Sequence, residues 1–329
     1  MDDPEGFLQG LRGKRLVIDE IHRLGNPSEL LKIAADHYRD IRIIATGSST
    51  LAATSKFSDT LAGRKEEIWL TPIMSADLVD FRCFSLQERF LKGGLPPFYL
   101  EQEIVERDYQ EWMDAYWARD IQSLFRLERR FSFQRLTELL MAQSGGMFEA
   151  TAFAAPCEVS RGTIHNYLTV LETTHLAHVV RPFNSRKATE IVSSPKVYMF
   201  DTGFICYHKG WNALRNEDLG LLWEHYVLNE IHARLHTTVV LYWRDKRGHE
   251  VAFILVRRGR APLAVECKWS SAAFDTGSLE AFARQYPEAE LAVVAPDVER
   301  PLTRQVKSVA LHYMSLEGLM AKASGWQQA

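Results

Sequence analysis

The sequence predicts an α/β protein assembled from several units, and three observations support this prediction. Its 329 residues exceed what one ordinary hydrophobic core accommodates, which favours two or three domains. Near the start, apolar runs at residues 15–20 and 41–45 flank a segment with helical spacing, the order of a β-α-β unit. The last third combines a long amphipathic helical segment with several strand-like runs.

Composition excludes several classes of protein. Hydrophobic residues make up 46% and charged residues 25% of the chain, as in soluble globular proteins. No apolar stretch approaches the roughly 20 residues that cross a bilayer, and residues 1–10 lack the pattern of a signal peptide. The four cysteines are scattered singly, without the spacing of a disulfide framework or a zinc site. We therefore expect a cytoplasmic protein without a membrane partner.

The first unit is predicted from residues 15–70. The run at 15–20 ends in two acids and fits a buried parallel strand, residues 28–38 have helical spacing, and 41–45 form a second buried strand. A further strand is expected at 67–70, and Pro72 is expected to end it. The pattern from 76 to 127 is then helical, interrupted at 93–97, with four aromatic residues at helical spacing that we expect in the core: Trp112, Tyr116, Trp117 and Phe125.

A second unit is predicted from residues 132–183. Helices are expected at 134–144 and 149–155, and Ser160 is placed to cap a third helix at 161–173. Residues 174–183 then have the pattern of a strand pair or wing. Helix, short helix, turn, capped helix and strand is the order of a winged helix-turn-helix.

The third predicted helix of this unit would be the recognition helix. It offers polar and basic side chains of the types that contact phosphates and base edges, namely Ser160, Arg161, Thr163, His165 and Asn166. Residues 126–187 hold eight Lys and Arg against five Asp and Glu, a modest basic stretch in a chain of net charge −3. Packing of this unit against neighbouring domains is therefore an equally open alternative to DNA binding.

The last unit is predicted to begin near residue 194. It contains a strand at 198–200 and a long helix at 220–236, and the expected elements that follow are strands at 239–243, 251–256 and 263–268, a helix at 278–286 and a strand at 291–295.

Polar residues follow both strands of the first unit. At the carboxyl end of the first strand, Asp19 would hold Mg²⁺ through its waters and Glu20 would orient an attacking water. Thr46 and Ser48 follow the next strand, where a polar sensor of a γ-phosphate belongs. Arg64 could face phosphate or be a solvated surface charge. Two acids after an apolar run also occur where a strand simply meets solvent.

A phosphate-binding loop is absent from the sequence. The pattern G-x-x-x-x-G-K-[ST] occurs nowhere in the 329 residues, and only eighteen residues precede Asp19. Without such a loop, backbone amides and a lysine for the phosphates are missing, so tight ATP binding is not expected. We expect the sequence to be truncated at its N-terminus.

Six segments in this order resemble a known family. They are DPEGFL at 3–8, VIDEIHR at 17–23, TGS at 46–48, LAGR at 61–64, GGLP at 93–96 and KVYMFDTG at 196–203. Together they resemble ATP-binding proteins of the AAA-type ATPase (AAA_14) family with a C-terminal DUF4143 domain, over nearly the whole chain.

This resemblance implies the domains and the cofactors. It divides the chain into a partial P-loop ATPase core at 1–75 with Walker B and sensor 1 positions, a helical lid at 76–130, a winged helix at 131–188 and a DUF4143 domain at 189–329 that resembles PD-(D/E)XK nucleases. ATP and Mg²⁺ are the implied cofactors, and DNA and further copies of the chain are the implied partners.

The nuclease-like domain has its own set of candidate residues. In PD-(D/E)XK nucleases an Asp and a Glu bind the metal and a Lys activates water, and the matching positions here are Glu224, Glu250, Glu266 and Lys268. Side chains two apart on a strand share a face, so Glu266 and Lys268 point together. The family's Asp is replaced by Ala252, and Glu250 lies about 6.6 Å away along the strand. We therefore expect an inactive nuclease-like fold, with an ion pair between Glu266 and Lys268 as the alternative role.

Three functions follow from these patterns. The first is a nucleotide-dependent ATPase-type protein that arranges its C-terminal domains on DNA or a protein partner. The second is a catalytically silent DNA-binding or scaffolding protein, which the missing loop and Ala252 favour. The third is a metal-dependent nuclease, for which we expect no cleavage.

Overall fold

The structure is a computed structural model. It describes the chain with gaps, over residues 3–47, 61, 63–66, 68, 70–102, 106–125, 127, 129–184, 194–235, 239–272, 275–307 and 309–325. In this part of the chain, no helix is long and apolar enough to span a lipid bilayer.

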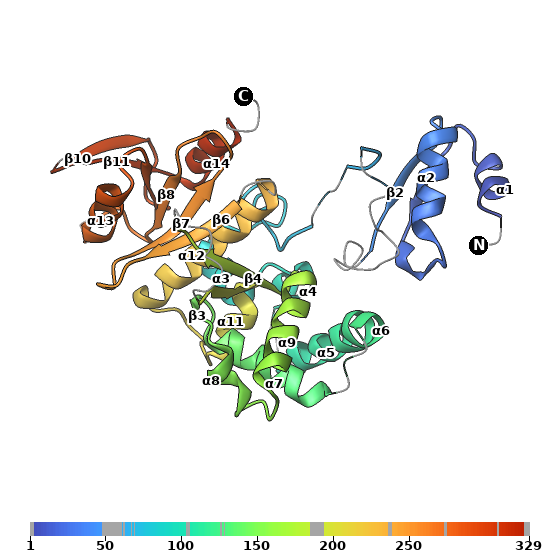
Figure 1. Ribbon diagram of the computed structural model, residues 1–329, viewed down its shortest axis with the longest axis horizontal. Coiled ribbons are helices and arrows are strands. Elements are labelled where there is room, and N and C mark those ends of the chain that lie inside the picture. Colours follow the sequence, from blue (N-terminus) through green and yellow to red (C-terminus); the bar gives the residue numbers. More distant parts are fainter. Residues whose placement is uncertain are drawn as a thin grey trace.

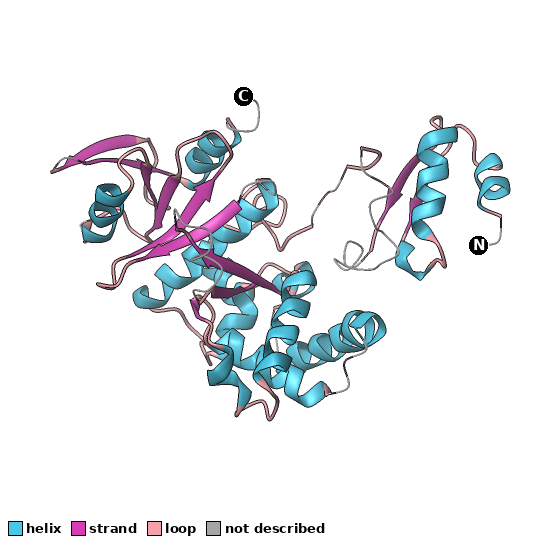
Figure 2. Cartoon of the chain, viewed as in Figure 1, coloured by secondary structure: helices cyan, strands magenta, loops and turns pink. Residues whose placement is uncertain are grey.

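The N-terminal unit has the expected β-α-β order. It contains α1 (Pro4–Gln9), β1 (Arg15–Ile18), the 3₁₀ turn η1 (Ile21–Arg23), α2 (Pro27–His37) and β2 (Arg42–Ala45), with β1 and β2 paired in parallel. A small core of Leu8, Leu30, Ala34 and Ile41 holds the helices on one face of this two-stranded sheet. The unit lies at one end of the molecule (Figures 1 and 2).

Two expectations for the following segment are wrong. Of the strand expected at 67–70, the structure describes residues 68 and 70, and neither lies in a strand. Both side chains are exposed, Leu70 to 95%, because no third strand pairs with the two-stranded sheet in the described residues. Residues 76–85 form turns instead of a helix, and the helix begins only after Ser85, whose hydroxyl caps it by accepting from the Glu88 amide at 3.3 Å.

Short helices make up the next part of the chain. They are α3 (Leu86–Lys92), α4 (Pro96–Leu100), α5 (Glu106–Tyr116), the π-helical turn η4 (Trp117–Ile121) and α6 (Gln122–Phe125). The aromatic residues expected in the core do pack there. Tyr116 and Trp117 are buried, and Trp112 and Phe125 pack against the main core.

The middle unit follows the expected order of helices. It contains α7 (Arg130–Ala142), β3 (Gly146–Met147), α8 (Ala150–Ala154), α9 (Arg161–Thr173), β4 (Ala177–Pro182) and β5 (Lys196–Met199). Ser160 caps α9 by accepting from the Thr163 amide at 3.1 Å, as predicted. Residues 174–183 contain the single strand β4 and not a strand pair, because its antiparallel partner is β5, beyond residues 185–193.

The C-terminal elements extend the same sheet. They are α11 (Thr202–His208), α12 (Asn216–Arg234), β6 (Val239–Arg244), β7 (Glu250–Val256), β8 (Leu263–Cys267), α13 (Gly277–Gln285), β9 (Glu290–Val294), β10 (Leu302–Val306), β11 (Val309–Met314) and α14 (Leu316–Ser324). The sequence patterns did not predict α11, β10, β11 or α14. The described strands outside the N-terminal unit form one mixed sheet in the order β10-β11-β9-β8-β7-β6-β4-β5-β3.

Helices cover both faces of this sheet. On one face, Leu222 and Leu228 of α12 pack in the main core with Phe253 of β7. On the other face, Phe282 of α13 packs in a second core with Ile254 of β7. Alternate side chains of β7 thus enter different cores, as expected for a strand covered on both sides. The fold is therefore a mixed α/β architecture with a buried central sheet.

Two of the quoted sequence motifs meet in space. The amide of Gly94, after α3, donates to the carboxylate of Asp201 at 2.7 Å, ahead of α11. Gly93 has φ +82°, and a Cβ on Gly203 would lie 2.7 Å from the Gly93 nitrogen, so the backbones approach too closely for larger residues. Arg89 is buried beside them and donates to the Ile73 carbonyl at 3.0 and 2.8 Å. This Asp201 joint fixes α3 to the C-terminal elements.

Candidate functional site

The carboxyl ends of β1 and β2 bring two predicted residues together. Because the strands are parallel and Ile18 lies opposite Ala45, the residues that follow them are neighbours. The Thr46 hydroxyl donates a hydrogen bond to the Asp19 carboxylate. The Glu20 amide donates to the same hydroxyl oxygen at 3.3 Å. Asp19, Glu20 and Thr46 therefore form one polar edge.

The shape of this edge exposes the Asp19 carboxylate. Glu20 has φ +51°, a left-handed conformation that is costly for a residue with a side chain and that turns the chain sharply after β1. The Asp19 side chain is exposed to solvent. Carboxylate and hydroxyl oxygens are ligands that suit Mg²⁺ and its bound waters. This donor set thus fits the acidic half of a magnesium–nucleotide site.

Arg64 and Ser48 do not join this edge among the described contacts. The Arg64 guanidinium pairs with Asp36 of α2 at 2.7 Å, and this pairing holds the pKa of the Asp36 carboxyl below its ordinary value. The hydrogen bond that Arg64 donates to the Asp36 carboxylate is also the main reason why the pKa of Arg64 is raised. Ser48 lies outside the described residues.

A second candidate site is a cavity of about 370 Å³ in the C-terminal part. It brings together all four nuclease-like candidates, from three elements. The lining residues are Glu224, Gly248, Glu250, Ala252, Glu266, Lys268, Asp275, Ser278 and Leu279. Glu224 comes from α12, Glu250 and Ala252 from β7, and Glu266 from β8. We call this cavity the carboxylate pocket.

A lysine that the sequence patterns did not single out serves two of these carboxylates. The ammonium of Lys196, on β5, lies 2.8 Å from Oε1 of Glu250 and 3.4 Å from Oε1 of Glu224. Burial lowers the pKa of Lys196, but the two carboxylates outweigh burial and raise it. The Tyr198 hydroxyl also donates to Glu224, and burial raises the pKa of that hydroxyl.

The third glutamate of the pocket is held by the other lysine. The Lys268 ammonium lies 2.8 Å from Oε1 of Glu266, the ion pair that the sequence offered as an alternative. The Ala252 amide donates to Oε2 of Glu266 at 3.4 Å. Burial raises the pKa of Glu266 although Lys268 acts in the opposite direction. Glu266 is thus satisfied by neighbours on β7 and β8.

This arrangement does not fit a divalent metal. Each of the three glutamates already contacts an ammonium, and Ala252 contributes a methyl group and no ligand. In the described part of the chain, no three His, Cys, Asp or Glu side chains are grouped so as to hold a metal ion. A metal would have to displace Lys196 or Lys268 first.

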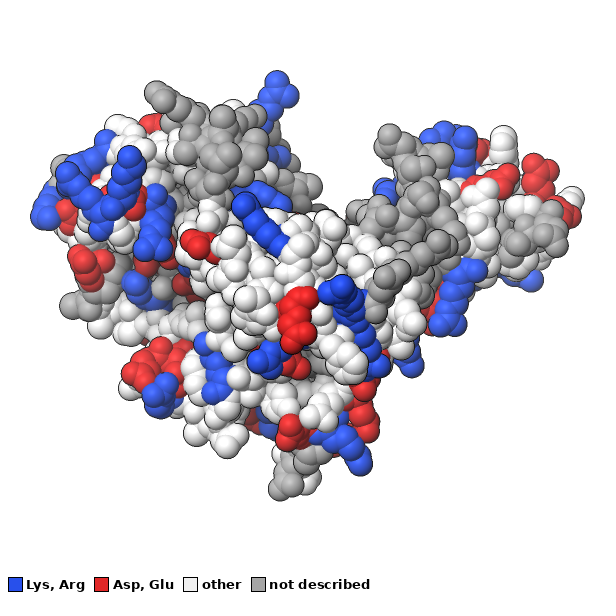
Figure 3. Space-filling model, turned by 60° about the horizontal axis from the view of Figure 1, so that its bottom comes forward, with Lys and Arg blue, Asp and Glu red and all other residues white. Residues whose placement is uncertain are grey.

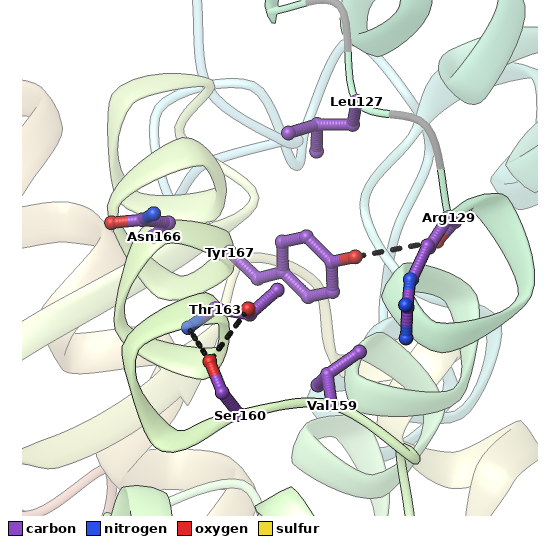
Figure 4. Close-up of a pocket in the computed structure, with 7 residues that line it drawn as sticks. All are labelled: Leu127, Arg129, Val159, Ser160, Thr163, Asn166 and Tyr167. Atoms are coloured by element: carbon purple, nitrogen blue, oxygen red, sulfur yellow. Dashed lines mark hydrogen bonds between the residues drawn. The ribbon is translucent and has the colours of Figure 1, made fainter.

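A third candidate site is a cavity of about 440 Å³ beside the start of α9 (Figure 4). It is lined by Leu127, Arg129, Val159, Ser160, Thr163, Asn166 and Tyr167. Ser160, Thr163 and Asn166 are three residues apart and share one face of the helix. Arg161 and His165, the other DNA-contact candidates, do not line this cavity. Arg129 and Tyr167, which the sequence patterns did not indicate, face each other across it, and the Tyr167 hydroxyl donates to the Arg129 carbonyl at 3.5 Å.

Comparison with known families agrees with two of the motif groups. Residues 2–79 match the family described as an AAA domain, and residues 219–314 match the domain of unknown function DUF4143. The chain is an AAA-type protein with a C-terminal DUF4143 domain. Residues 84–215 match a further family, the domain of unknown function DUF8612. The Asp19–Thr46 edge lies in the AAA match and the carboxylate pocket in the DUF4143 match, whereas Lys196 comes from the DUF8612 match.

Similar proteins extend over most of this AAA-type chain. Uncharacterized proteins of Mycobacterium bovis and Mycobacterium tuberculosis are each 28% identical over 317 residues, covering 93% of this chain and 70% of the relative. A solved half-complex of Thermococcus gammatolerans McrB AAA+ hexamers with bound McrC is similar with a TM-score of 0.28 and 9% identity. That match covers 79% of this chain and spans 60% of the other chain, and so low a TM-score supports no further inference.

One signal in the sequence could have indicated Lys196. It belongs to the segment KVYMFDTG, and residues two apart on a strand share a face, so Lys196 and Tyr198 point the same way. The partners of Lys196, however, lie 28 and 54 residues away along the chain. Sequence spacing alone could not connect them.

Proposed function

We propose that this AAA-type protein binds a magnesium–nucleotide at the Asp19–Thr46 edge and transmits the nucleotide state to its C-terminal units. The observation that carries the proposal is the hydrogen bond between Thr46 and Asp19 at adjacent strand ends. Asp19 would hold the metal through its waters, Glu20 would orient water, and Thr46 would respond to the terminal phosphate. Mg²⁺ supplies charge neutralisation of the phosphates.

The contacts of residues 73–75, which follow the N-terminal unit in the chain, support transmission to the C-terminal elements. The Ser75 amide donates to Glu230 of α12, and the Ser75 hydroxyl donates to Glu317 of α14 at 3.0 Å. The Ile73 carbonyl accepts from buried Arg89. A movement of residues 73–75 would therefore change hydrogen bonds to two C-terminal helices, α12 and α14.

The order of elements supports the assignment of a winged helix in the middle of the chain and of a nuclease-like domain after it. The sequence α7-β3-α8-α9-β4-β5, with β3 and β4 both antiparallel to β5, is that of a winged helix. A second run of elements resembles the core of a PD-(D/E)XK nuclease. It consists of the helix α12, the antiparallel strands β6, β7 and β8, the helix α13, and β9, which is parallel to β8. The lysine-paired carboxylates favour a domain that does not cleave nucleic acid.

Nucleotide titration of the 329-residue chain tests the main proposal. We expect Mg²⁺-dependent ATP binding in the millimolar range, because the G-x-x-x-x-G-K-[ST] pattern is absent, and Asp19→Asn should weaken it about tenfold, or ~1.4 kcal/mol. Isothermal titration with and without Mg²⁺ measures both constants.

Asp40→Asn is the matched control, since Asp40 lies before β2 and its carboxylate accepts from the Gly13 amide at 2.9 Å. It makes the same change of charge in the same unit and should leave binding unchanged. The proposed site would be ruled out if the wild type and Asp19→Asn bound ATP with equal affinity. It would also be ruled out if the wild type showed no binding at millimolar Mg²⁺-ATP.

DNA binding is the second candidate function, and the cavity beside α9 favours it. Its wall combines the start of a helix, three hydroxyls, an amide and Arg129, groups that contact phosphates and bases. Acidic and basic side chains are interspersed over the face seen in Figure 3, so binding would depend on few contacts.

Salt-dependent DNA binding tests this candidate. Arg129→Ala should weaken binding and reduce the slope of log K against log salt by about 1, the loss of one phosphate contact. Fluorescence anisotropy with duplex DNA at several salt concentrations measures the slope. Arg135→Ala on α7 is the control, because the Arg135 guanidinium pairs only weakly with Glu138, at 3.9 Å. This variant should keep the wild-type slope of log K against log salt. DNA affinity that is the same for both variants and insensitive to salt would exclude this function.

A further inference from the structure

The carboxylate pocket contains a positive charge that comes from another part of the chain. Lys196 belongs to β5, whose strand partners are β3 and β4, whereas Glu224 and Glu250 belong to α12 and β7. The Lys196 side chain is only 8% exposed, so its ammonium is largely shielded from water. Its position between two glutamates is therefore built into the packing of three elements.

Physical chemistry requires a cation at this point. Two carboxylates that face one pocket repel each other, and the repulsion grows as water is excluded. A buried carboxylate is tolerated when an opposite charge and hydrogen bonds satisfy its oxygens. Here Glu224 receives the Lys196 ammonium and the Tyr198 hydroxyl, and Glu250 receives the same ammonium at 2.8 Å with Arg244 at 3.7 Å.

A divalent metal needs the same oxygens. Mg²⁺ binds oxygen ligands at about 2.1 Å and demands near-octahedral geometry, so an ammonium within hydrogen-bonding distance of both glutamates and a metal between them exclude each other. The third glutamate, Glu266 of β8, is held by Lys268, which lies directly after the same strand. The position of Ala252 adds no ligand, since its side chain is a methyl group.

We propose that Lys196 is the resident cation of the carboxylate pocket: its ammonium takes the place of a divalent metal, and removing its charge turns the pocket into a divalent-cation site. The pocket of this DUF4143 domain is then an ionic joint between β5, α12 and β7. The lysine performs the charge neutralisation that a metal performs elsewhere, without making a reactive centre.

Manganese binding to the full chain tests this proposal. Mn²⁺ is used because electron paramagnetic resonance counts the free ion directly. The wild type should show no saturable site below millimolar Mn²⁺, and Lys196→Met should gain one with an affinity at least tenfold higher. Mn²⁺ should also raise the melting temperature of Lys196→Met, a readout that needs no enzymatic activity.

Three variants distinguish the proposal from a general effect of charge. Lys196→Arg keeps the charge and should gain no Mn²⁺ site. Lys307→Met, which removes an exposed lysine paired with Glu280 on another element, should behave as the wild type does. The double variant Lys196→Met/Glu250→Gln removes a carboxylate as well and should lose the gained site while recovering melting temperature.

Two results would overturn the proposal. One is saturable Mn²⁺ binding by the wild type that Glu266→Gln or Glu224→Gln abolishes, because the pocket would then hold a metal beside the lysine. The other is a folded Lys196→Met chain, judged by its circular dichroism, that binds Mn²⁺ no better than the wild type. If Lys196→Met alone fails to fold, the double variant should fold, and its failure would equally contradict the ionic role of Lys196.

Discussion

Replacing Asp201 with alanine is expected to lower the free energy of unfolding by roughly 4 kcal/mol. The carboxylate is buried and accepts hydrogen bonds from the amides of Gly94 at 2.7 Å, Gly203 at 2.9 Å and Phe204 at 3.4 Å. Alanine leaves three buried donors without an acceptor, and each costs about 1–3 kcal/mol. It also removes the negative charge that faces Arg89, which is only 1% exposed.

The close packing at this joint prevents neighbouring groups from moving to replace the lost hydrogen bonds. A Cβ on Gly93 would lie 2.2 Å from the Asp201 carboxylate, so the surrounding backbone is already in contact. Burial raises the pKa of Asp201, while Arg89 and the backbone amides act against it. The joint is therefore a polar network whose loss exposes several groups at once.

Chemical denaturation followed by circular dichroism measures the effect. Asp201→Asn retains one acceptor oxygen and should lose less than alanine does. Asp114→Ala is the control, because Asp114 is 61% exposed and pairs with Arg130 at the surface, and it should cost under about 1 kcal/mol. A loss for Asp201→Ala no larger than this would show that the joint contributes little.

Acidification from pH 7 to pH 5 is expected to lower the free energy of unfolding by roughly 4 kcal/mol through two histidines. Burial lowers the pKa of both His225 and His232 to about 4. In the unfolded chain both titrate near 6.5, so the unfolded state binds more protons below that value. Their contribution is complete above pH 6.5 and is lost as pH falls from 6.5 towards 4, roughly 2 kcal/mol each by pH 5.

The contacts of His225 explain why its neutral form is favoured. Nδ1 lies 2.8 Å from the Leu221 carbonyl, so this nitrogen carries the hydrogen. Nε2 lies 2.7 Å from the Ser144 hydroxyl, whose oxygen accepts from the Met199 amide at 2.7 Å. The serine hydrogen is thus directed at Nε2, and a proton there would compete with it.

The environment of His232 differs from that of His225, but it also favours the neutral form of the ring. The His232 ring stacks on His178, with ring centres 4.3 Å apart, and its buried Nε2 has no hydrogen-bond partner among the residues that the structure describes. The His178 ring donates to Asn229 at 3.0 Å, since the Asn229 amide nitrogen donates to Phe200 and leaves its oxygen for the histidine. The pKa of His178 is lowered as well, by burial and by His232. Protonating the stack would place like charges face to face.

Stability curves at several pH values test this expectation. His232→Phe keeps a ring on His178 and removes one titrating group, so the loss between pH 7 and pH 5 should shrink by about 2 kcal/mol. His312→Gln, on β11 between β10 and β9, should leave the pH dependence as in the wild type. A His232→Phe chain that loses as much stability at pH 5 as the wild type would contradict the assignment.

Local patterns were enough for much of the fold. The alternation of apolar runs and helical spacing predicted β1, α2 and β2, and Ser160 predicted the start of α9 from one hydroxyl and one amide. The face shared by Glu266 and Lys268 follows from the two-residue repeat of a strand. Patterns failed where elements lack their own signal, as in the exposed strand β10 and in residues 76–85.

The candidate sites divide in the same way. The residues of the Asp19–Thr46 edge could be predicted because parallel strands end at the same side of a sheet. The pairing of Arg64 with Asp36 could not, since nothing near residue 64 indicates the exposed face of α2 that it meets. Arg129 was missed for a similar reason, because its cavity lies between the residues just ahead of α7 and the start of α9, about 30 residues apart in the chain.

By itself the sequence determined the α/β class and the AAA and DUF4143 motifs, because these depend on residues close together in the chain. Only the tertiary structure decided that Lys196 neutralises Glu224 and Glu250, that Asp201 joins α3 to α11, and that β4 and β6 pair to form one continuous sheet. Each of these contacts joins segments far apart along the chain. Their energy comes from burial and charge pairing that exist only after the segments have packed together.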